Sequence, residues 1–158
     1  MAIVILGREN VGKSTLFNTL IHKNKAFVSK EPGTTRDNKY GIVQWRGQEL
    51  TIVDTAGINV DDESTINVHM QQKIHQAIEE AEVILFVVNC KTGIHVLDRK
   101  MAKMIRDSEK PYVLVANKAD NKLLTEYSHE FNQLGLGEPT PISASSGKGT
   151  GDVLDLSM

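Results

Sequence analysis

The sequence predicts a three-layer α/β fold, in which helices cover both faces of a mostly parallel six-stranded sheet with one antiparallel edge strand. Short runs rich in Val, Ile and Leu alternate along the chain with stretches whose apolar residues recur every three or four positions. Three runs are continuously apolar, which is typical of strands covered on both faces. The six expected strands are Ile3–Leu6, Tyr40–Trp45, Leu50–Val53, Val83–Asn89, Tyr112–Ala116 and Thr140–Ile142.

The predicted helices lie between these strands. In Ile66–Glu80 and Leu97–Arg106 the apolar residues recur at the spacing of a helix with one buried face. A shorter helix, Ser14–Ile21, follows the first strand, and weaker ones are expected at Lys122–Leu134 and Gly151–Leu156. Strands joined through a helix are parallel, with right-handed crossovers. Ligands of such sheets bind outside the carboxyl ends of the strands.

One pair of strands breaks this alternation. Tyr40–Trp45 and Leu50–Val53 are joined by a short turn that contains Gly47, so they are predicted to form an antiparallel hairpin. The segment before the hairpin, Lys23–Asn38, is polar and is predicted to be a long connecting loop. Loops of that length in compact domains are usually functional or mobile.

Length and composition exclude several classes of protein. With 158 residues the chain is expected to form a single domain. The net charge of −2 excludes a strongly basic domain that wraps nucleic acid, so strong direct binding of nucleic acid is not expected. The single cysteine, Cys90, excludes an intrachain disulfide. The longest apolar run is far shorter than the ~18 residues of a membrane helix, so no membrane association and a cytoplasmic location are expected.

Gly7–Ser14 carries a phosphate-binding motif. It reads GRENVGKS and fits the pattern G-x-x-x-x-G-K-S/T, between a predicted strand and a predicted helix. The glycines let the backbone bend around an anion, so that N–H groups and the positive end of the helix face the phosphates. Lys13 is predicted to reach the β- and γ-phosphates and Ser14 to bind Mg²⁺. Further nucleotide contacts are expected from Asn10, Val11, Gly12 and Thr15.

Two further segments are predicted to complete the phosphate site. Asp54 follows the third predicted strand in a D-x-x-G pattern, and its carboxylate is expected to hold Mg²⁺ through water. The N–H of Gly57, at the end of that pattern, is expected to meet the γ-phosphate. Thr35 is predicted to give Mg²⁺ a second hydroxyl, with its neighbour Thr34 as the less favoured alternative.

Asn117–Asp120, at the end of the fifth predicted strand, reads NKAD and is predicted to select the base. The carboxylate of Asp120 can accept hydrogen bonds from N1–H and the 2-amino group of guanine, whereas adenine has neither donor. Asn117 is expected to bond to the N7 edge and to brace the phosphate loop. The aliphatic stem of Lys118 is expected to lie along the base and sugar.

A last loop is predicted to touch the same base. Ser143–Ser145 follows the final strand, and the N–H of Ala144 is expected to donate to the guanine O6. In chain order, these motifs predict a site for GTP or GDP with Mg²⁺.

On these motifs the chain resembles the translation-factor-like GTPases, and within them the first GTPase domain of the bacterial Der (EngA) family. Further similar stretches are PGTTRD at 32–37, AIEEAEVILFVV at 77–88 and SASSGKGTGDVLDL at 143–156. The resemblance implies a P-loop GTPase fold and hydrolysis of GTP to GDP and phosphate. It also implies a nucleotide switch in assembly of the large ribosomal subunit, with the ribosome bound through the full-length protein.

The same resemblance sets an expectation for domain organisation. Members of the family carry two GTPase domains and a C-terminal KH-like domain. Residues 1–158 are therefore expected to be one P-loop GTPase domain, an N-terminal fragment that docks against domains missing here.

Four positions depart from the family's pattern or bear on the mechanism. Glu9 replaces the usual proline and puts a carboxylate near the phosphates. Thr34 produces the string GTTRD, which looks like the tRNA-modification GTPases of the MnmE type, the alternative within the superfamily. Ile58 stands where many GTPases have a glutamine that orients water. Resemblance to cation-activated GTPases suggests that Asn10 helps to bind a catalytic K⁺.

Without such a cation the isolated domain is expected to be a slow hydrolase. A second alternative is a regulatory module that holds GDP or GTP with little turnover of its own. Measuring GTP hydrolysis by the purified domain distinguishes the slow hydrolase from the regulatory module.

Overall fold

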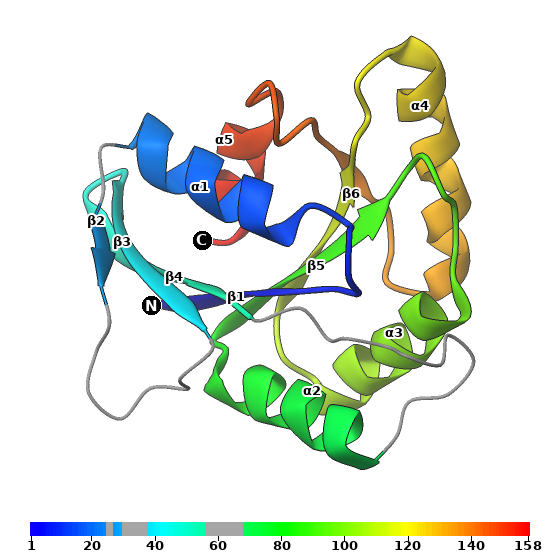
Figure 1. The fold of residues 1–158 in the computed structure, drawn as a ribbon, viewed down its shortest axis with the longest axis horizontal. Coiled ribbons are helices and arrows are strands. Elements are labelled where there is room, and N and C mark those ends of the chain that lie inside the picture. The colour runs from blue at the N-terminus through cyan, green and yellow to red at the C-terminus, as the bar shows by residue number, and fades with distance from the viewer. Residues whose placement is uncertain (25–26, 30–37, 56–67) are drawn as a thin grey trace.

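The computed structural model describes residues 1–24, 27–29, 38–55 and 68–158, and it confirms the three-layer α/β fold (Figure 1). A central sheet has helices on both faces. The elements in chain order are β1 (Ala2–Leu6), α1 (Lys13–Lys23), β2 (Phe27–Ser29), β3 (Lys39–Trp45), β4 (Gln48–Asp54), α2 (Val68–Glu80), β5 (Val83–Asn89), α3 (Val96–Ser108), β6 (Tyr112–Asn117), α4 (Lys122–Tyr127), the 3₁₀ helix η1 (Ser128–Leu134), β7 (Thr140–Pro141) and α5 (Thr150–Leu156).

The sheet follows the order β2-β3-β4-β1-β5-β6-β7. β1 lies between β4 and β5 and is parallel to both, and β6 and β7 continue in the same direction. β3 and β4 form the predicted antiparallel hairpin. The carboxyl ends of β1, β4, β5 and β6 therefore meet at one edge of the sheet, where Gly7–Ser14, Asp54 and Asn117–Asp120 lie.

The sheet has seven strands rather than the predicted six, because β2 lies within the segment expected to be a loop. β2 pairs antiparallel with β3, for example Val28 opposite Gly41, so the antiparallel β3 is the second strand and not the edge strand. Three residues are too few to show a two-residue periodicity in the sequence. β2 forms instead because the backbone N–H and C=O groups along one edge of β3 bond to it.

The two faces of the sheet bury different residues of each central strand. Ile3 and Ile5 of β1 pack in the core that includes α1 and α5, whereas Val4 and Leu6 pack in the core that includes α2 and α3. Every residue of β5 is buried. This two-sided covering confirms the interpretation of the continuously apolar runs.

The predicted helix Lys122–Leu134 has two parts, α4 and η1. At their junction the hydroxyl of Ser128 donates a 2.6 Å hydrogen bond to the carbonyl oxygen of Thr125. Serine side chains that bond to the preceding turn compete with the regular helical ladder. Of the helices that the structure describes, none combines the length and the apolarity needed to cross a membrane.

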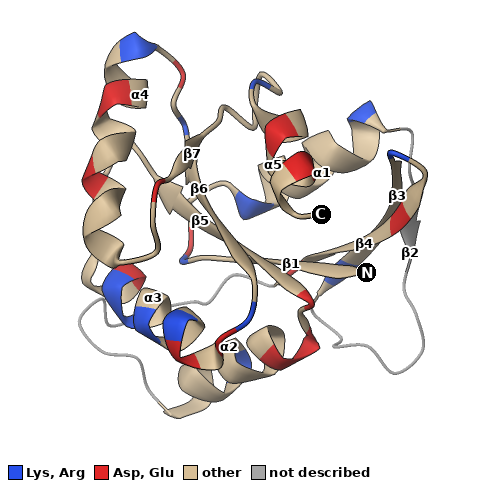
Figure 2. Ribbon diagram, turned by 180° about the vertical axis from the view of Figure 1, so that it is seen from behind, with Lys and Arg blue, Asp and Glu red and all other residues tan. Residues whose placement is uncertain are grey.

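Acidic and basic residues are interspersed over the helices, and basic residues are most frequent along α3 (Figure 2). The basic residues of that helix are Arg99, Lys100, Lys103 and Arg106.

Candidate nucleotide-binding site

The P-loop, Gly7–Ser14, connects the end of β1 to the start of α1 (Figure 1). Its backbone adopts left-handed conformations at Asn10 (φ 66°) and at Gly12 (φ 98°). Gly12 is the N-cap of α1 and has no side chain to cap the first turn, so the N–H groups there are available to an anion. A cavity of about 450 Å³ opens beside the loop. It is lined by Glu9, Asn10, Gly12, Lys13, Ser14, Thr15, Lys39, Asp54, Thr55 and Lys118.

The two glycines of the motif occupy positions with no room for a side chain. A Cβ atom at Gly7 would lie 2.6 Å from the carbonyl oxygen of Val87 in β5. One at Gly12 would lie 2.2 Å from Nδ2 of Asn117. Contacts with β5 and β6 therefore require these glycines, in addition to any contact with an anion.

Lys13 is buried although it carries an amine. Its Nζ donates hydrogen bonds to the carbonyl oxygens of Gly7, at 2.7 Å, and Arg8, at 3.0 Å. Burial lowers the pKa of Lys13 to about 8, and the nearby charges of Asp54 and Glu9 oppose that shift. The amine thus lies at the cavity wall, where a bound anion would stabilise its charged form.

The structure places Glu9 at this cavity, as the sequence predicted. Glu9 is exposed and lines the cavity together with Lys13. Its carboxylate acts on Lys13 by favouring the charged amine. A carboxylate here also repels an incoming phosphate, and this repulsion weakens in salt because the group is in contact with solvent.

Asp54 and Ser14 form an oxygen pair that fits a divalent cation. The hydroxyl of Ser14 donates a 3.1 Å hydrogen bond to Oδ2 of Asp54. The other carboxylate oxygen, Oδ1, is buried and has no hydrogen-bond partner among the described residues. Burial raises the pKa of Asp54, while Ser14 and Lys13 oppose the rise. An unpartnered buried carboxylate oxygen beside a hydroxyl is what Mg²⁺ or its water ligands would satisfy.

Two residues predicted for the phosphate site, Thr35 and Gly57, lie outside the described residues. The same holds for Thr34 and Ile58. Their proposed roles rest on the sequence alone.

Asn117 joins the P-loop to the base-binding side of the site. Its Nδ2 donates to the carbonyl oxygen of Val11 at 2.9 Å, which is the brace that the sequence predicted. Its Oδ1 accepts a 3.0 Å hydrogen bond from the N–H of Ala144, the donor that the sequence assigned to guanine O6. Asn117 is almost fully buried, so an amide oxygen without a partner there would be costly. Ala144 therefore positions Asn117 in this structure.

Asp120 lines a smaller cavity of about 170 Å³, together with Gly12, Thr15, Lys91, Asn117, Lys118 and Ser145. The hydroxyl of Ser143 donates a 2.7 Å hydrogen bond to Oδ1 of Asp120, and Nζ of Lys91 lies 3.1 Å from Oδ2. The hydrogen bond from Ser143, followed by the contact with Lys91, lowers the pKa of Asp120. These neighbours favour the ionised carboxylate and fix its orientation. Both are needed for Asp120 to accept hydrogen bonds from two N–H groups of a base.

Lys118 and Ser145 complete the base side. Nζ of Lys118 donates a 2.9 Å hydrogen bond to the carbonyl oxygen of Asn10, so its stem spans from β6 to the P-loop. Its backbone is left-handed, with φ 64°. The hydroxyl of Ser145 lies 3.4 Å from that of Ser143. The structure therefore gathers residues of the P-loop, Asp54, Asn117–Asp120 and the Ser143–Ser145 loop around two adjoining cavities.

Sequence reasoning missed two residues that touch this site, Arg8 and Lys91. Lys91 pairs with Asp120, and Arg8 ties the P-loop to α3 through Asp98. Lys91 follows the end of β5, and residues at the carboxyl end of a parallel strand are candidates for a site in this fold. That positional rule was the available signal for Lys91. Nothing in the sequence pairs Arg8 with a residue 90 positions away.

Comparison with known proteins agrees with this geometry. Residues 2–118 match the family described as 50S ribosome-binding GTPase. GTPase Der of Amoebophilus asiaticus is 49% identical over 153 residues, which cover 97% of this chain and 35% of that protein. GTPase Der of Porphyromonas gingivalis is 47% identical over 156 residues, which cover 99% and 36%. The chain thus spans little more than a third of the length of these relatives.

Solved structures agree with the fold. A variant of Aquifex aeolicus Era bound to GDP.AlF4⁻ superposes with a TM-score of 0.73 at 30% identity, covering 98% of this chain and 54% of that one. The G domain of the T. maritima FeoB iron transporter superposes with a TM-score of 0.72 at 20% identity, covering 99% and 95%, which supports the fold alone. The chain therefore belongs to the 50S ribosome-binding GTPase family.

Proposed function

We propose that this chain is the nucleotide-operated switch of a larger protein that acts in assembly of the large ribosomal subunit. The family description and the GTPase Der relatives support this assignment over the MnmE-type alternative. In this proposal residues 1–158 form one GTPase domain of a cytoplasmic protein with a second GTPase domain, and they dock against its other domains. The share of the relatives' length that the chain spans, 35%, is consistent with that organisation.

The observation that carries the proposal is the direct link between the phosphate and base cavities. One side chain, Asn117, bonds to the P-loop at Val11 and to the Ala144 loop. Lys118 makes a second connection to the P-loop at Asn10. A ligand with a guanine base and a phosphate chain matches both cavities at once. We assign the nucleotide contacts to Asn10, Val11, Gly12, Lys13, Ser14, Thr15, Asn117, Lys118, Asp120, Ser143 and Ser145. Ala144, which the sequence also assigned to the base, supports them by bonding to Asn117.

In the proposed reaction, water attacks the γ-phosphate of GTP, and the products are GDP and phosphate. Catalysis of this transfer consists mostly of positioning and charge stabilisation. Lys13 and the N–H groups at the start of α1 stabilise negative charge on the β- and γ-oxygens. Ser14 and Asp54, with Thr35, would hold Mg²⁺, which would supply positive charge to offset the negative charge of the phosphates. The N–H of Gly57 positions the γ-phosphate.

Replacing Ser14 with alanine is expected to weaken the dependence of GDP binding on Mg²⁺. The variant lacks the hydroxyl that donates to Asp54 and that we propose as a ligand of Mg²⁺. Loss of a group that supports a metal site typically lowers metal affinity about 10- to 100-fold. GDP release should be measured with a fluorescent GDP, with Mg²⁺ present and after chelation by EDTA. In the wild type chelation should speed release, whereas in Ser14→Ala the two rates should be nearly equal. A variant that keeps the full Mg²⁺ effect contradicts the assignment.

Asn10 is our candidate ligand for a catalytic K⁺. It lines the phosphate cavity, and its carboxamide has no hydrogen-bond partner among the described residues. Its backbone is fixed by Lys118, so the side chain projects from a defined point of the loop. A monovalent cation held there supplies positive charge near the phosphates, in the role of an arginine finger.

GTP turnover is expected to be at least about tenfold faster in KCl than in NaCl, because one well-placed charge contributes on that scale or more. The replacement Asn10→Ala should remove the difference while the NaCl rate is kept. Equal rates in the two salts contradict the role of K⁺. Turnover that is undetectable in both salts favours the regulatory module that binds nucleotide without hydrolysing it.

The ribosomal role is tested by binding. The chain should sediment with isolated large ribosomal subunits when it holds a non-hydrolysable GTP analogue, and less with GDP. Small subunits and free tRNA serve as the comparisons, because Era has been solved with 16S rRNA and the MnmE-type alternative acts on tRNA. Preference for tRNA, or binding that ignores the nucleotide, contradicts the proposal.

A further inference from the structure

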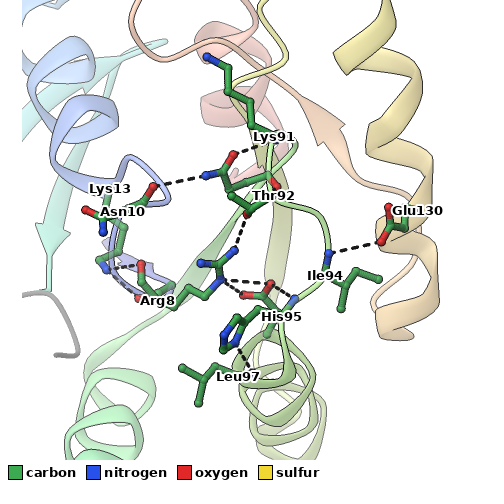
Figure 3. A network of polar contacts seen from close by, with 12 residues as sticks. Arg8, Asn10, Lys13, Lys91, Thr92, Ile94, His95, Leu97 and Glu130 are labelled. Carbon is green, nitrogen blue, oxygen red and sulfur yellow. Dashed lines mark hydrogen bonds and ion pairs between the residues drawn. The ribbon is translucent and has the colours of Figure 1, made fainter. Parts of the chain in front are cut away.

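A charged side chain of the P-loop is tied to α3 by a buried ion pair. Nε of Arg8 lies 3.2 Å from Oδ1 of Asp98 and 3.4 Å from Oδ2. The Asp98 side chain is fully buried and that of Arg8 is 13% exposed. Arg8 also donates a 2.7 Å hydrogen bond to the hydroxyl of Thr92 in the loop before α3 (Figure 3). The guanidinium is therefore fixed at three points.

Asp98 is itself held rigidly at the start of α3. Its Oδ2 accepts a 2.9 Å hydrogen bond from the N–H of His95, and Nδ1 of His95 accepts one of 3.0 Å from the N–H of Leu97. These reciprocal bonds form a capping box. Burial raises the pKa of Asp98, and the bonds from His95 and Arg8 oppose the rise. A buried carboxylate of this kind is tolerated only with its partners in place.

Arg8 connects this anchor to the phosphate cavity. Its side chain reaches α3, while its own carbonyl oxygen accepts a 3.0 Å hydrogen bond from Nζ of Lys13. Figure 3 shows the Arg8 side chain extending toward α3 and the Lys13 amine bonded to the backbone at Arg8. A shift of the backbone at Arg8 would therefore move one of the two carbonyl oxygens that hold the Lys13 amine at the phosphate cavity.

We propose that Asp98 is a positioning residue for phosphate binding, which acts through Arg8 to hold the P-loop and Lys13 in place. This inference rests on the proposed nucleotide site. Its competitor is a purely structural role, in which Asp98 caps α3 and stabilises the fold without affecting the P-loop. The positioning role predicts a loss of affinity that is specific to the β-phosphate, whereas the structural role predicts no such selectivity.

The test compares affinities for GDP and GMP, because GMP lacks the β-phosphate but keeps the base. Asp98→Asn preserves the shape of the side chain and removes its charge. We expect it to weaken GDP binding about tenfold, since hydrogen bonds between charged groups contribute on that scale, with GMP binding changed much less. Affinities are measured by competition against a fluorescent GDP, at a temperature where circular dichroism shows the variant folded. Thr92→Val provides a second, milder variant at an exposed contact of Arg8.

The matched control is Arg46→Ala, which breaks an exposed ion pair with Asp155 outside the described nucleotide site. It should leave the ratio of GDP to GMP affinity unchanged. A fall of that ratio in Asp98→Asn and in Thr92→Val supports the positioning role. An unchanged ratio, or equal losses for GDP and GMP, overturns it, and if Asp98→Asn does not fold then Thr92→Val alone decides. Absence of GDP binding by the wild type would instead contradict the nucleotide site itself.

Discussion

Replacing Asp120 with asparagine is expected to lower GDP affinity by about 10³- to 10⁴-fold and to create a preference for XDP, the xanthine analogue. A site built to pair with specific polar groups rejects ligands that leave those groups unpaired by factors of this order. The asparagine side chain offers one acceptor and one donor in place of two acceptors. Xanthine has a carbonyl oxygen where guanine has its 2-amino group, so it matches the changed pair. Affinities for GDP, XDP and ADP should be measured by competition.

The fold provides an internal control for this substitution. Asp120 is exposed, and its contacts with Ser143 and Lys91 are made between side chains. We therefore expect the melting temperature without nucleotide to change by only about 1–3 °C, as is usual for surface substitutions. Rescue by XDP would show that the phosphate cavity is intact. A variant that still prefers GDP over XDP would contradict the role of Asp120 in base selection.

The sequence predicted the parts of the fold that repeat a pattern or satisfy a motif. Strands covered on both faces have continuous apolar sequences, so β1 and β5 were predicted at the correct places in the chain. β2 was missed because three residues carry no periodicity and their pairing depends on β3. The split of α4 from η1 was missed because it reflects a local hydrogen bond of Ser128.

The candidate site shows the same division. Asn117 and Gly12 were both predicted from motifs. In the structure the Asn117 side chain lies so close to Gly12 that no side chain fits at position 12, which explains why glycine stands there. The ion pair between Arg8 and Asp98 joins residues far apart in sequence. It forms because the fold buries the Asp98 side chain next to Arg8, where a carboxylate needs a partner. Sequence patterns record local spacing, whereas contacts of this kind follow from how β5 and α3 place their ends beside the P-loop.

Replacing Lys13 with methionine is expected to lower GTP turnover by about 10²- to 10³-fold, because it removes a charge aimed at the transferring phosphate. Methionine keeps an apolar stem of similar length, so the buried path of the side chain stays filled. The carbonyl oxygens of Gly7 and Arg8 lose their donor, which should cost the nucleotide-free protein about 1–3 kcal/mol of stability per unpaired group at most. Single-turnover hydrolysis separates the chemical step from binding.

The lowered pKa of Lys13 gives this prediction a second readout. With a pKa of about 8 in the nucleotide-free protein, the amine is largely neutral above that pH. Phosphates stabilise its charged form and raise the pKa, so GDP binding at pH 8.5 must take up protons, and affinity falls as pH rises above 8. Titration calorimetry in buffers with different ionisation enthalpies measures this uptake. The uptake should be absent in Lys13→Met, whereas titration of the base itself is the same in both proteins. Equal proton uptake by the two proteins would contradict direct contact between Lys13 and the phosphates.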